Sequence, residues 1–163
     1  MTDVLTPESR SLCMSRIRGT NTKPELQIRK LLFAEGFRYK LNDASLPGKP
    51  DLVFPKYKAV IFVHGCFWHG HGCRLFKVPE TNREFWVTKI ANNRANDSRC
   101  RKALQRCGWR ILTIWECALR GPGRLDPAKI ASAASDWLLS ARRSATIGGV
   151  RTQRRRGTRA ARS

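Results

Sequence analysis

The chain has 163 residues, with 32 Lys and Arg against 12 Asp and Glu, so its formal net charge is +20. This length allows one domain with its own hydrophobic core, without disulfides to hold it together. Charged residues or His interrupt every apolar run short of a membrane span, and Asp3, Glu8 and Arg10 break up any N-terminal signal peptide. We therefore expect neither a transmembrane protein nor a secreted mini-protein. The charge predicts a polyanionic partner, most often nucleic acid.

The positive charge is concentrated toward the C-terminus. From Trp137 onward there are eight Arg and no acidic residue, which leaves +12 on residues 1–136. After about Ser144 the sequence consists mainly of Arg, Gly, Ser, Thr and Ala, with little apolar surface to bury. We therefore expect one domain over residues 1–143 and a disordered Arg-rich tail over residues 144–163.

Two helices are predicted before the first strand. Residues 8–18 suit a short basic helix that ends at Gly19. A firmer helix begins after Thr22, which forms a capping box with Glu25, and it ends at Gly36. Its apolar face is expected to consist of Leu26, Ile28, Leu31 and Leu32.

Three extended segments follow this helix. Residues 37–41 alternate between apolar and polar side chains, and residues 51–54 and 59–63 are compact apolar runs of strand length. Pro50 and Pro55 border the second segment.

The second half predicts a helix, a strand and a final helix. The helix covers residues 81–106, the β-prone strand covers residues 109–115, and the last helix covers residues 127–141 with Asp126 as its N-cap. This order of elements predicts a mixed α/β domain in which helices pack on a central sheet.

All three His and two of the six Cys lie in the decapeptide HGCFWHGHGC, residues 64–73. Imidazole and thiolate are preferred Zn²⁺ ligands, and Cys66, His71 and Cys73 offer three from one loop in which Gly70 and Gly72 let the backbone turn. The fourth ligand is predicted to be a cysteine at the end of residues 109–115, Cys117, if that strand neighbours residues 59–63. The alternative is a group of buried, metal-free cysteines, which we prefer for Cys13, Cys100 and Cys107.

His64 and His69 are left over from the zinc prediction, and they flank Phe67 and Trp68. Acid–base catalysis beside exposed aromatic rings is one interpretation. The other is that the aromatic rings pack in the core and the imidazoles satisfy local hydrogen bonds.

Asp51 opens a buried strand, and the next strand leads into the His-rich loop. A lone Asp after Pro is usually a turn or cap residue. In nucleases built on such paired strands, however, a carboxylate at this point holds Mg²⁺ against the scissile phosphate, and a nearby His takes a proton from water.

Four segments in order resemble the very-short-patch repair endonucleases, the Vsr family. They are PGKPDLVF, VIFVHGCFWHGHGC, FKVPETNREFW and GWRILTIWECALRG. The resemblance covers roughly residues 8–121 and leaves out the last helix and the tail. The (D/E)-x-K half of the broader nuclease signature is absent, because Val63-His64-Gly65 occupies its place.

This resemblance implies a restriction-endonuclease-like fold of the PD-(D/E)XK type, with a mixed central sheet flanked by helices and a structural zinc site. It implies nicking of one strand on the 5′ side of the thymine in T:G mismatches that arise when 5-methylcytosine deaminates. The implied cofactors are catalytic Mg²⁺ and structural Zn²⁺. The implied substrate is double-stranded DNA, and the protein is expected to be a monomer in the bacterial cytoplasm, associated with the nucleoid.

The resemblance also implies roles for individual residues. Asp51 would bind Mg²⁺, together with the backbone carbonyl of Val63, and His69 would be the general base, while His64 and Glu25 would support metal-bound waters. The implied zinc ligands are Cys66, His71, Cys73 and Cys117. The implied DNA-binding residues are the wedge of Phe67, Trp68 and Trp86, followed by Lys89 and Asn93 at the mismatched pair.

Several of these residues also have simpler interpretations. Glu25 is fully explained as a capping-box residue. Trp86 sits in a helical run where an aromatic is usually core, although Phe85 can fill that place, and Lys89 and Asn93 suit a solvated helical face. Two rival functions stay open: a non-catalytic zinc-stabilised DNA-binding module, and a nuclease of the same fold with a different DNA target.

Overall fold

The computed structural model describes residues 22–150, so the helix expected at residues 8–18, Cys13 and the tail beyond Val150 lie outside the described residues. In the described part, five strands form one sheet in the order β1-β2-β3-β4-β5. The strands are β1 (Lys40–Leu41), β2 (Leu52–Phe54), β3 (Ala59–His64), β4 (Arg110–Trp115) and β5 (Ser144–Ile147). The first three are antiparallel neighbours, whereas β3, β4 and β5 run parallel.

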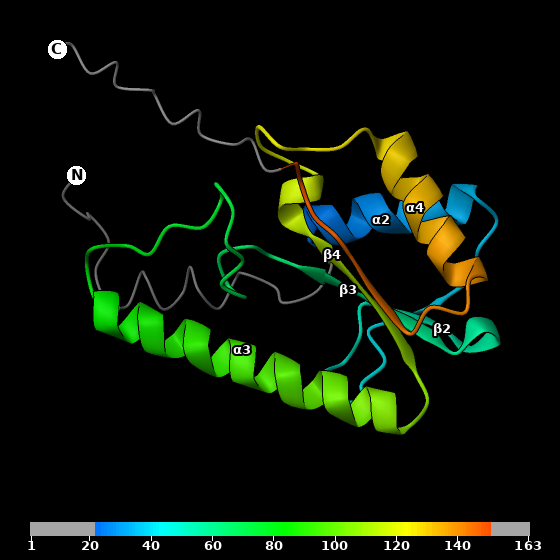
Figure 1. Ribbon diagram of the computed structural model, residues 1–163, viewed down its shortest axis with the longest axis horizontal. Coiled ribbons are helices and arrows are strands. Elements are labelled where there is room, and N and C mark those ends of the chain that lie inside the picture. The colour runs from blue at the N-terminus through cyan, green and yellow to red at the C-terminus, as the bar shows by residue number, and fades with distance from the viewer. Residues whose placement is uncertain (1–21, 151–163) are drawn as a thin grey trace, which may run out of the picture.

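Three α-helices cover the two faces of this sheet (Figure 1). They are α2 (Lys23–Ala34), α3 (Arg83–Arg106) and α4 (Pro127–Leu139). Helices α2 and α4 pack together on one face, where Trp137 and Ile28 join the larger hydrophobic core, and α3 crosses the other face, where Leu104 packs with Val60. Short 3-10 turns follow β2 and β4: η1 (Pro55–Tyr57) and η2 (Glu116–Ala118). The mixed α/β prediction is confirmed.

Local sequence signals explain most element boundaries. The Thr22 hydroxyl accepts a hydrogen bond from the backbone N–H of Glu25 at the start of α2, and Asp126 accepts from Ala128 at the start of α4. Successive side chains of β3 point to opposite faces of the sheet. Most of them are buried on either face, because helices cover both sides. Within residues 22–150, the predicted helices and central strands are confirmed to within about two residues.

Two details near the N-terminal helix differ from expectation. Only Lys40–Leu41 pairs in the sheet, not all of residues 37–41, because the N–H of Phe37 donates to the Leu32 carbonyl and ends α2. Gly36 makes this turn possible with a φ of +91°. Leu26, assigned to the apolar face, is 41% exposed.

The expected tail start at Ser144 is wrong. Residues Ser144–Ile147 form β5, which pairs in parallel with β4. Backbone hydrogen bonds to a neighbouring strand do not require apolar side chains, so composition alone missed this strand. Ala145 and Ile147 nevertheless pack against the larger core, and this alternation is visible in the sequence SATI.

Among residues 22–150, no helix combines the length and the apolar character that crossing a bilayer requires.

Candidate active site

Two carboxyl groups from different elements meet beside the sheet. Asp51, just before β2, accepts a hydrogen bond of 2.7 Å through Oδ2 from the backbone N–H of Val63 on β3. Glu25 of α2 is 2% exposed, and its Oε2 accepts from Arg29 at 3.2 Å. Burial raises the pKa of Asp51 to about 7; the Val63 N–H opposes the rise and the Glu25 carboxyl adds to it. Two neighbouring buried carboxyl groups suit a divalent cation.

Glu25 belongs to the helix cap, and its side chain also lies near Asp51. Its backbone N–H donates to Thr22 Oγ1 at 3.5 Å, so it takes part in the helix cap. Its carboxyl group lies beside Asp51, where it influences that residue's pKa. The cap therefore orients the helix so that this side chain faces the site.

The two spare histidines form a stacked pair. His64 ends β3, His69 lies in the following loop, and their ring centroids are 3.8 Å apart at an interplanar angle of 5°. His69 Nδ1 lies 2.5 Å from Oδ2 of Asp97 on α3. Burial, together with the neighbouring His69, lowers the pKa of His64 to about 3, so His64 is neutral near pH 7.

Asp97 was not predicted as a site residue. It lies four residues after Asn93 and eight after Lys89, on the helical face already assigned to DNA contact, and the other acidic residue of α3 is Glu84. An acidic residue on the helical face expected to contact DNA could therefore have pointed to Asp97 as a site residue. Its pairing with His69 depends on how the loop after β3 packs against α3.

These groups line one cavity of about 1040 Å³ between α3, the central strands β3 and β4, and the start of α2. Asp51 and Glu25 lie in its wall together with His64, His69 and Asp97. Trp68 of the loop after β3 also borders it. The arrangement brings a candidate metal-binding acid, a candidate proton acceptor and an aromatic side chain to the same space.

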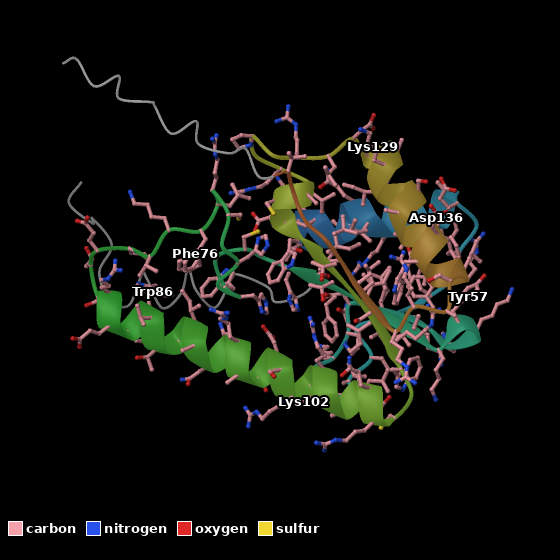
Figure 2. All side chains as sticks on the ribbon, viewed as in Figure 1. Tyr57, Phe76, Trp86, Lys102, Lys129 and Asp136 are labelled. Atoms are coloured by element: carbon pink, nitrogen blue, oxygen red, sulfur yellow. The ribbon has the colours of Figure 1, made fainter. Side chains whose placement is uncertain are left out.

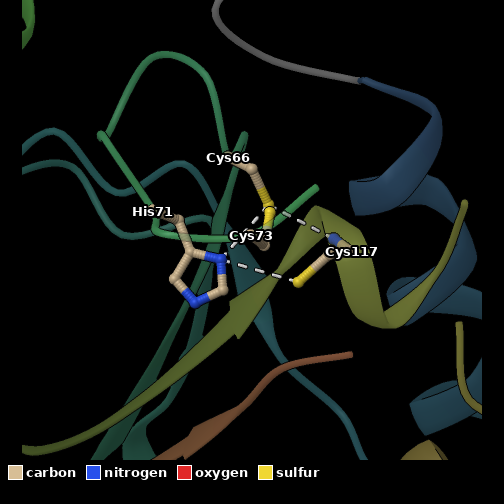
Figure 3. A group of neighbouring side chains, drawn as sticks. All are labelled: Cys66, His71, Cys73 and Cys117. Atoms are coloured by element: carbon tan, nitrogen blue, oxygen red, sulfur yellow. Dashed lines mark hydrogen bonds between the residues drawn. The ribbon is translucent and has the colours of Figure 1, made fainter. Parts of the chain in front are cut away.

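A second cluster joins the loop after β3 to the turn after β4, as Figure 3 shows. The ligand atoms of its residues all lie within 4.8 Å of one another; the residues are Cys66, His71, Cys73 and Cys117. Strands β3 and β4 are adjacent and parallel, as the choice of Cys117 required. Gly70 has a φ of +63° and sits against Ile90, which lets the loop turn, whereas Gly72 shows no such strain.

The spacing within this cluster fits a zinc ion. His71 Nδ1 lies 3.6 Å from Cys66 Sγ and 3.6 Å from Cys117 Sγ. A tetrahedron with Zn–S of about 2.3 Å and Zn–N of about 2.0 Å separates sulfur from nitrogen by about 3.5 Å, close to these distances. The Cys66 sulfur also accepts a hydrogen bond from the Cys117 N–H, and the Cys117 sulfur accepts one from Gly149. The cluster can therefore bind a metal ion.

Trp115, at the end of β4, lies between the two clusters. Its ring stacks on His71 at 4.2 Å and 10°, and its centroid lies 5.3 Å from that of His64 in an edge contact. The Cys/His cluster and the histidine pair are thus packed around the indole of Trp115.

Aromatic side chains gather where the loop meets the start of α3. Phe67 contacts Trp68 and Trp86 at centroid distances of 5.2 and 5.5 Å, and Trp68 contacts Trp86 at 5.8 Å. Phe76, labelled beside Trp86 in Figure 2, adds a fourth ring 6.4 Å from Phe67. Phe85 is 58% exposed, so the idea that it fills the core in place of Trp86 is wrong; Ile90 is the buried residue.

Lys89 and Asn93 share a face of α3, with different surroundings. Lys89 is exposed at the cavity wall. The Asn93 side-chain amide donates to the backbone carbonyl of Trp68 at 2.9 Å, which ties the aromatic loop to the helix.

The expectation of buried cysteines on α3 is wrong for Cys107, which is exposed. The helix ends at Arg106, so Cys107 is the C-cap and lies outside the packed turns. Cys100 is half-buried at the cavity wall.

Comparison with known proteins places these features in a family. The sequence model described as DNA mismatch endonuclease Vsr matches residues 2–75. The Type II nicking enzyme V.XorIIP of Xanthomonas oryzae pv. oryzae is 48% identical over 126 residues, which is 77% of this chain and 93% of that protein. The Type II nicking enzyme V.NmeAIP of Neisseria meningitidis is 45% identical over 74% of this chain and 86% of that protein.

These similarities, together with the site, define a DNA endonuclease. The DNA mismatch endonuclease Vsr of Escherichia coli is 44% identical over 147 residues, covering 90% of this chain and 94% of that protein. The chain belongs to the Vsr family of DNA mismatch endonucleases.

Proposed function

We propose that this endonuclease hydrolyses one strand of duplex DNA on the 5′ side of the thymine in a T:G mismatch, in a Mg²⁺-dependent reaction. The observation that carries the proposal is the shared cavity: Asp51 and Glu25 face it together with His69 and its partner Asp97. Trp68 borders the same space, and Phe67 and Trp86 pack against its ring. Reaction groups and a base-stacking surface therefore meet at one position on the duplex.

The acidic side of the cavity is proposed to hold Mg²⁺ through Asp51 and the Val63 carbonyl. When bound there, the ion would neutralise charge on the phosphate and make a coordinated water more acidic. The Val63 N–H fixes the orientation of the Asp51 carboxylate. Glu25, kept in place by Arg29, can accept hydrogen bonds from coordinated water.

His69 is proposed as the general base. An ionised Asp97 is only an acceptor, so His69 Nδ1 carries the hydrogen between them and Nε2 has a free lone pair for the proton of the attacking water. His64, neutral and stacked on His69, restricts the ring's orientation without adding positive charge.

We assign the Cys66, His71, Cys73 and Cys117 cluster to structural zinc, because three thiols and one imidazole are the donor set of a closed zinc site. Zinc there would join the loop that carries His69 to the turn after β4. Metal binding at such a site is coupled to folding.

The aromatic cluster of Phe67, Trp68 and Trp86 is proposed as a wedge beside the mismatch. Unstacking one base step costs a few kcal/mol, and less where pairing is already weak. Lys89 is proposed to contact the DNA near the mismatched pair, while Asn93 both faces it and holds Trp68 in place. We further propose a PD-(D/E)XK-type fold and a monomer that acts in the bacterial cytoplasm, close to the nucleoid.

The deciding experiment is a nicking panel with zinc-loaded protein and labelled duplexes, each with a T:G pair in a different sequence context. We expect Mg²⁺-dependent cutting of one strand 5′ of the thymine, and far slower cutting of matched duplexes. Equal cutting of matched and mismatched DNA would assign the chain a different target. No cutting of any duplex in the panel would contradict the proposal.

A further inference from the structure

The cavity contains positive charge that the described protein leaves unmatched. Three of its four wall carboxyl groups are paired with basic side chains; the pairs are Glu25–Arg29, Asp97–His69 and Glu116–Arg120. Three basic side chains also line it: Lys49, Lys89 and Arg101. Within residues 22–150, none of these three has a carboxylate at ion-pair distance. Free cations beside a metal-binding acid suit an anionic ligand.

Arg101 differs from the two lysines because it is held by the sheet. Its Nη2 donates to Thr113 Oγ1 at 3.2 Å. Thr113 is 1% exposed in the middle of β4, and it is one of two buried polar residues in the described chain, the other being Glu25. A buried hydroxyl is costly without a hydrogen bond, so the sheet gains stability when the guanidinium stays in this position.

This position is next to the candidate reaction groups. Arg101 lies one turn after Asp97 on α3, and it lines the same cavity as His64 and His69. Thr113 pairs with Phe62 in the parallel ladder, and Asp51 bonds the following residue, Val63, from the other side of β3. The guanidinium and the Asp51 carboxyl thus face one cavity from two sides.

We propose that Arg101, oriented by Thr113, binds the phosphodiester at the nicking position. The proposal rests on the proposed nuclease function and adds a phosphate-binding residue to it. One of the five guanidinium N–H groups donates to Thr113, and within residues 22–150 the other four have no hydrogen-bond acceptor, so they can donate to phosphate oxygens. Gly65 stands where the (D/E)-x-K pattern has its lysine, so a cation from α3 takes the place of one from β3.

The test compares Arg101→Ala with Arg99→Ala under single-turnover conditions. Both variants remove one arginine from an exposed position on α3, but Arg99 bonds Asn96 and lies outside the cavity wall. We expect Arg101→Ala to slow nicking of the T:G duplex by about 100-fold or more. Arg99→Ala should stay within about threefold of the original rate, as expected for a surface charge. Equal effects of the two variants would overturn the proposal.

Two further variants separate charge from orientation. Arg101→Lys keeps the positive charge but loses the planar guanidinium with its several N–H donors. We expect a rate between those of the original protein and Arg101→Ala. Thr113→Val keeps the shape of the strand, so it should leave folding and DNA binding intact while slowing nicking by about tenfold through a freed guanidinium. An unchanged rate in Thr113→Val would contradict the orienting role.

DNA binding at increasing salt provides a readout that does not need nicking. Loss of one phosphate contact should reduce the slope of log affinity against log salt by about 0.9. We expect this change in Arg101→Ala, measured without Mg²⁺ on the T:G duplex, and no change in Arg99→Ala. If the original protein never nicks T:G DNA, the proposed function is contradicted. A shallower slope in Arg101→Ala would still support the phosphate contact in that case. An unchanged slope would contradict the contact itself.

Discussion

The carboxyl group of Asp51 is buried beside that of Glu25, and both conditions disfavour its ionised form. Its pKa of about 7 contrasts with an ordinary value of 3.8. Between these values the native protein holds a proton that the unfolded chain releases. The stability of the metal-free site therefore falls as the pH rises from about 4 to 7.

Asp51→Asn should remove this cost. At pH 8, without added Mg²⁺, we expect a melting temperature at least about 3 °C above that of the original protein, and a smaller difference near pH 5. Nicking should be lost while DNA binding remains. Differential scanning calorimetry measures the melting temperatures, in buffers without chelators that would remove zinc.

The control for this substitution is Asp136→Asn on the exposed side of α4, which should change neither stability nor nicking. A melting temperature of Asp51→Asn below that of the original protein at pH 8 would mean that the carboxylate stabilises the fold.

Among the secondary-structure elements, β5 and the residues after it connect the edge of the sheet to the Cys/His cluster. The Gly149 N–H donates to Cys117 Sγ at 3.2 Å, and the Val150 N–H donates to the Gly123 carbonyl at 2.8 Å. A Cβ on Gly149 would lie 2.4 Å from the Cys117 carbonyl oxygen, so only glycine allows this approach. The segment that follows the unexpected strand β5 thus supports Cys117, the ligand predicted from strand adjacency.

Gly149→Ala should push residues 148–150 away from Cys117 and remove the N–H···S hydrogen bond. Because hydrogen bonds to metal ligands tune affinity, we expect zinc binding to weaken by about 10–100-fold. Competition with a coloured chelator measures this loss directly.

Gly72→Ala is the matched control, since a Cβ there meets nothing within 4 Å although the residue neighbours two cluster members. It should retain zinc like the original protein. If both variants retain zinc equally, the contact from Gly149 has no role in metal binding.

At the scale of the whole molecule, the excess charge divides between the described domain and the C-terminal sequence. Six of the eight arginines after Trp137 lie beyond Val150. Since β5 belongs to the sheet and Gly149 touches Cys117, a deletion that tests these arginines must begin after Val150 and not at Ser144.

A chain that ends at Val150 should bind DNA more weakly at moderate salt, because it loses phosphate contacts. Each lost contact should also reduce the slope of log affinity against log salt by about 0.9. The ratio of T:G to matched nicking should remain, since the groups proposed to recognise the mismatch lie in the domain. Anisotropy titrations at several salt concentrations and the nicking assay measure the two quantities. Loss of the mismatch preference would assign recognition to the deleted residues.

Features that depend on neighbours along the chain could be predicted from the sequence. The Thr22 cap, the apolar runs of β2 to β4 and the Cys/His loop are local patterns, and Cys117 followed once adjacent strands were assumed. Four ordered segments were also enough to identify the family.

Pairings between distant segments could not be predicted in this way. Asp97 meets His69 across 28 residues, and Arg101 meets Thr113 across a helix–strand interface. Strand β5 is held by its backbone at the sheet edge. Such contacts depend on the strand register and on how α3 lies over the sheet, and hydrophobic periodicity along the chain specifies neither.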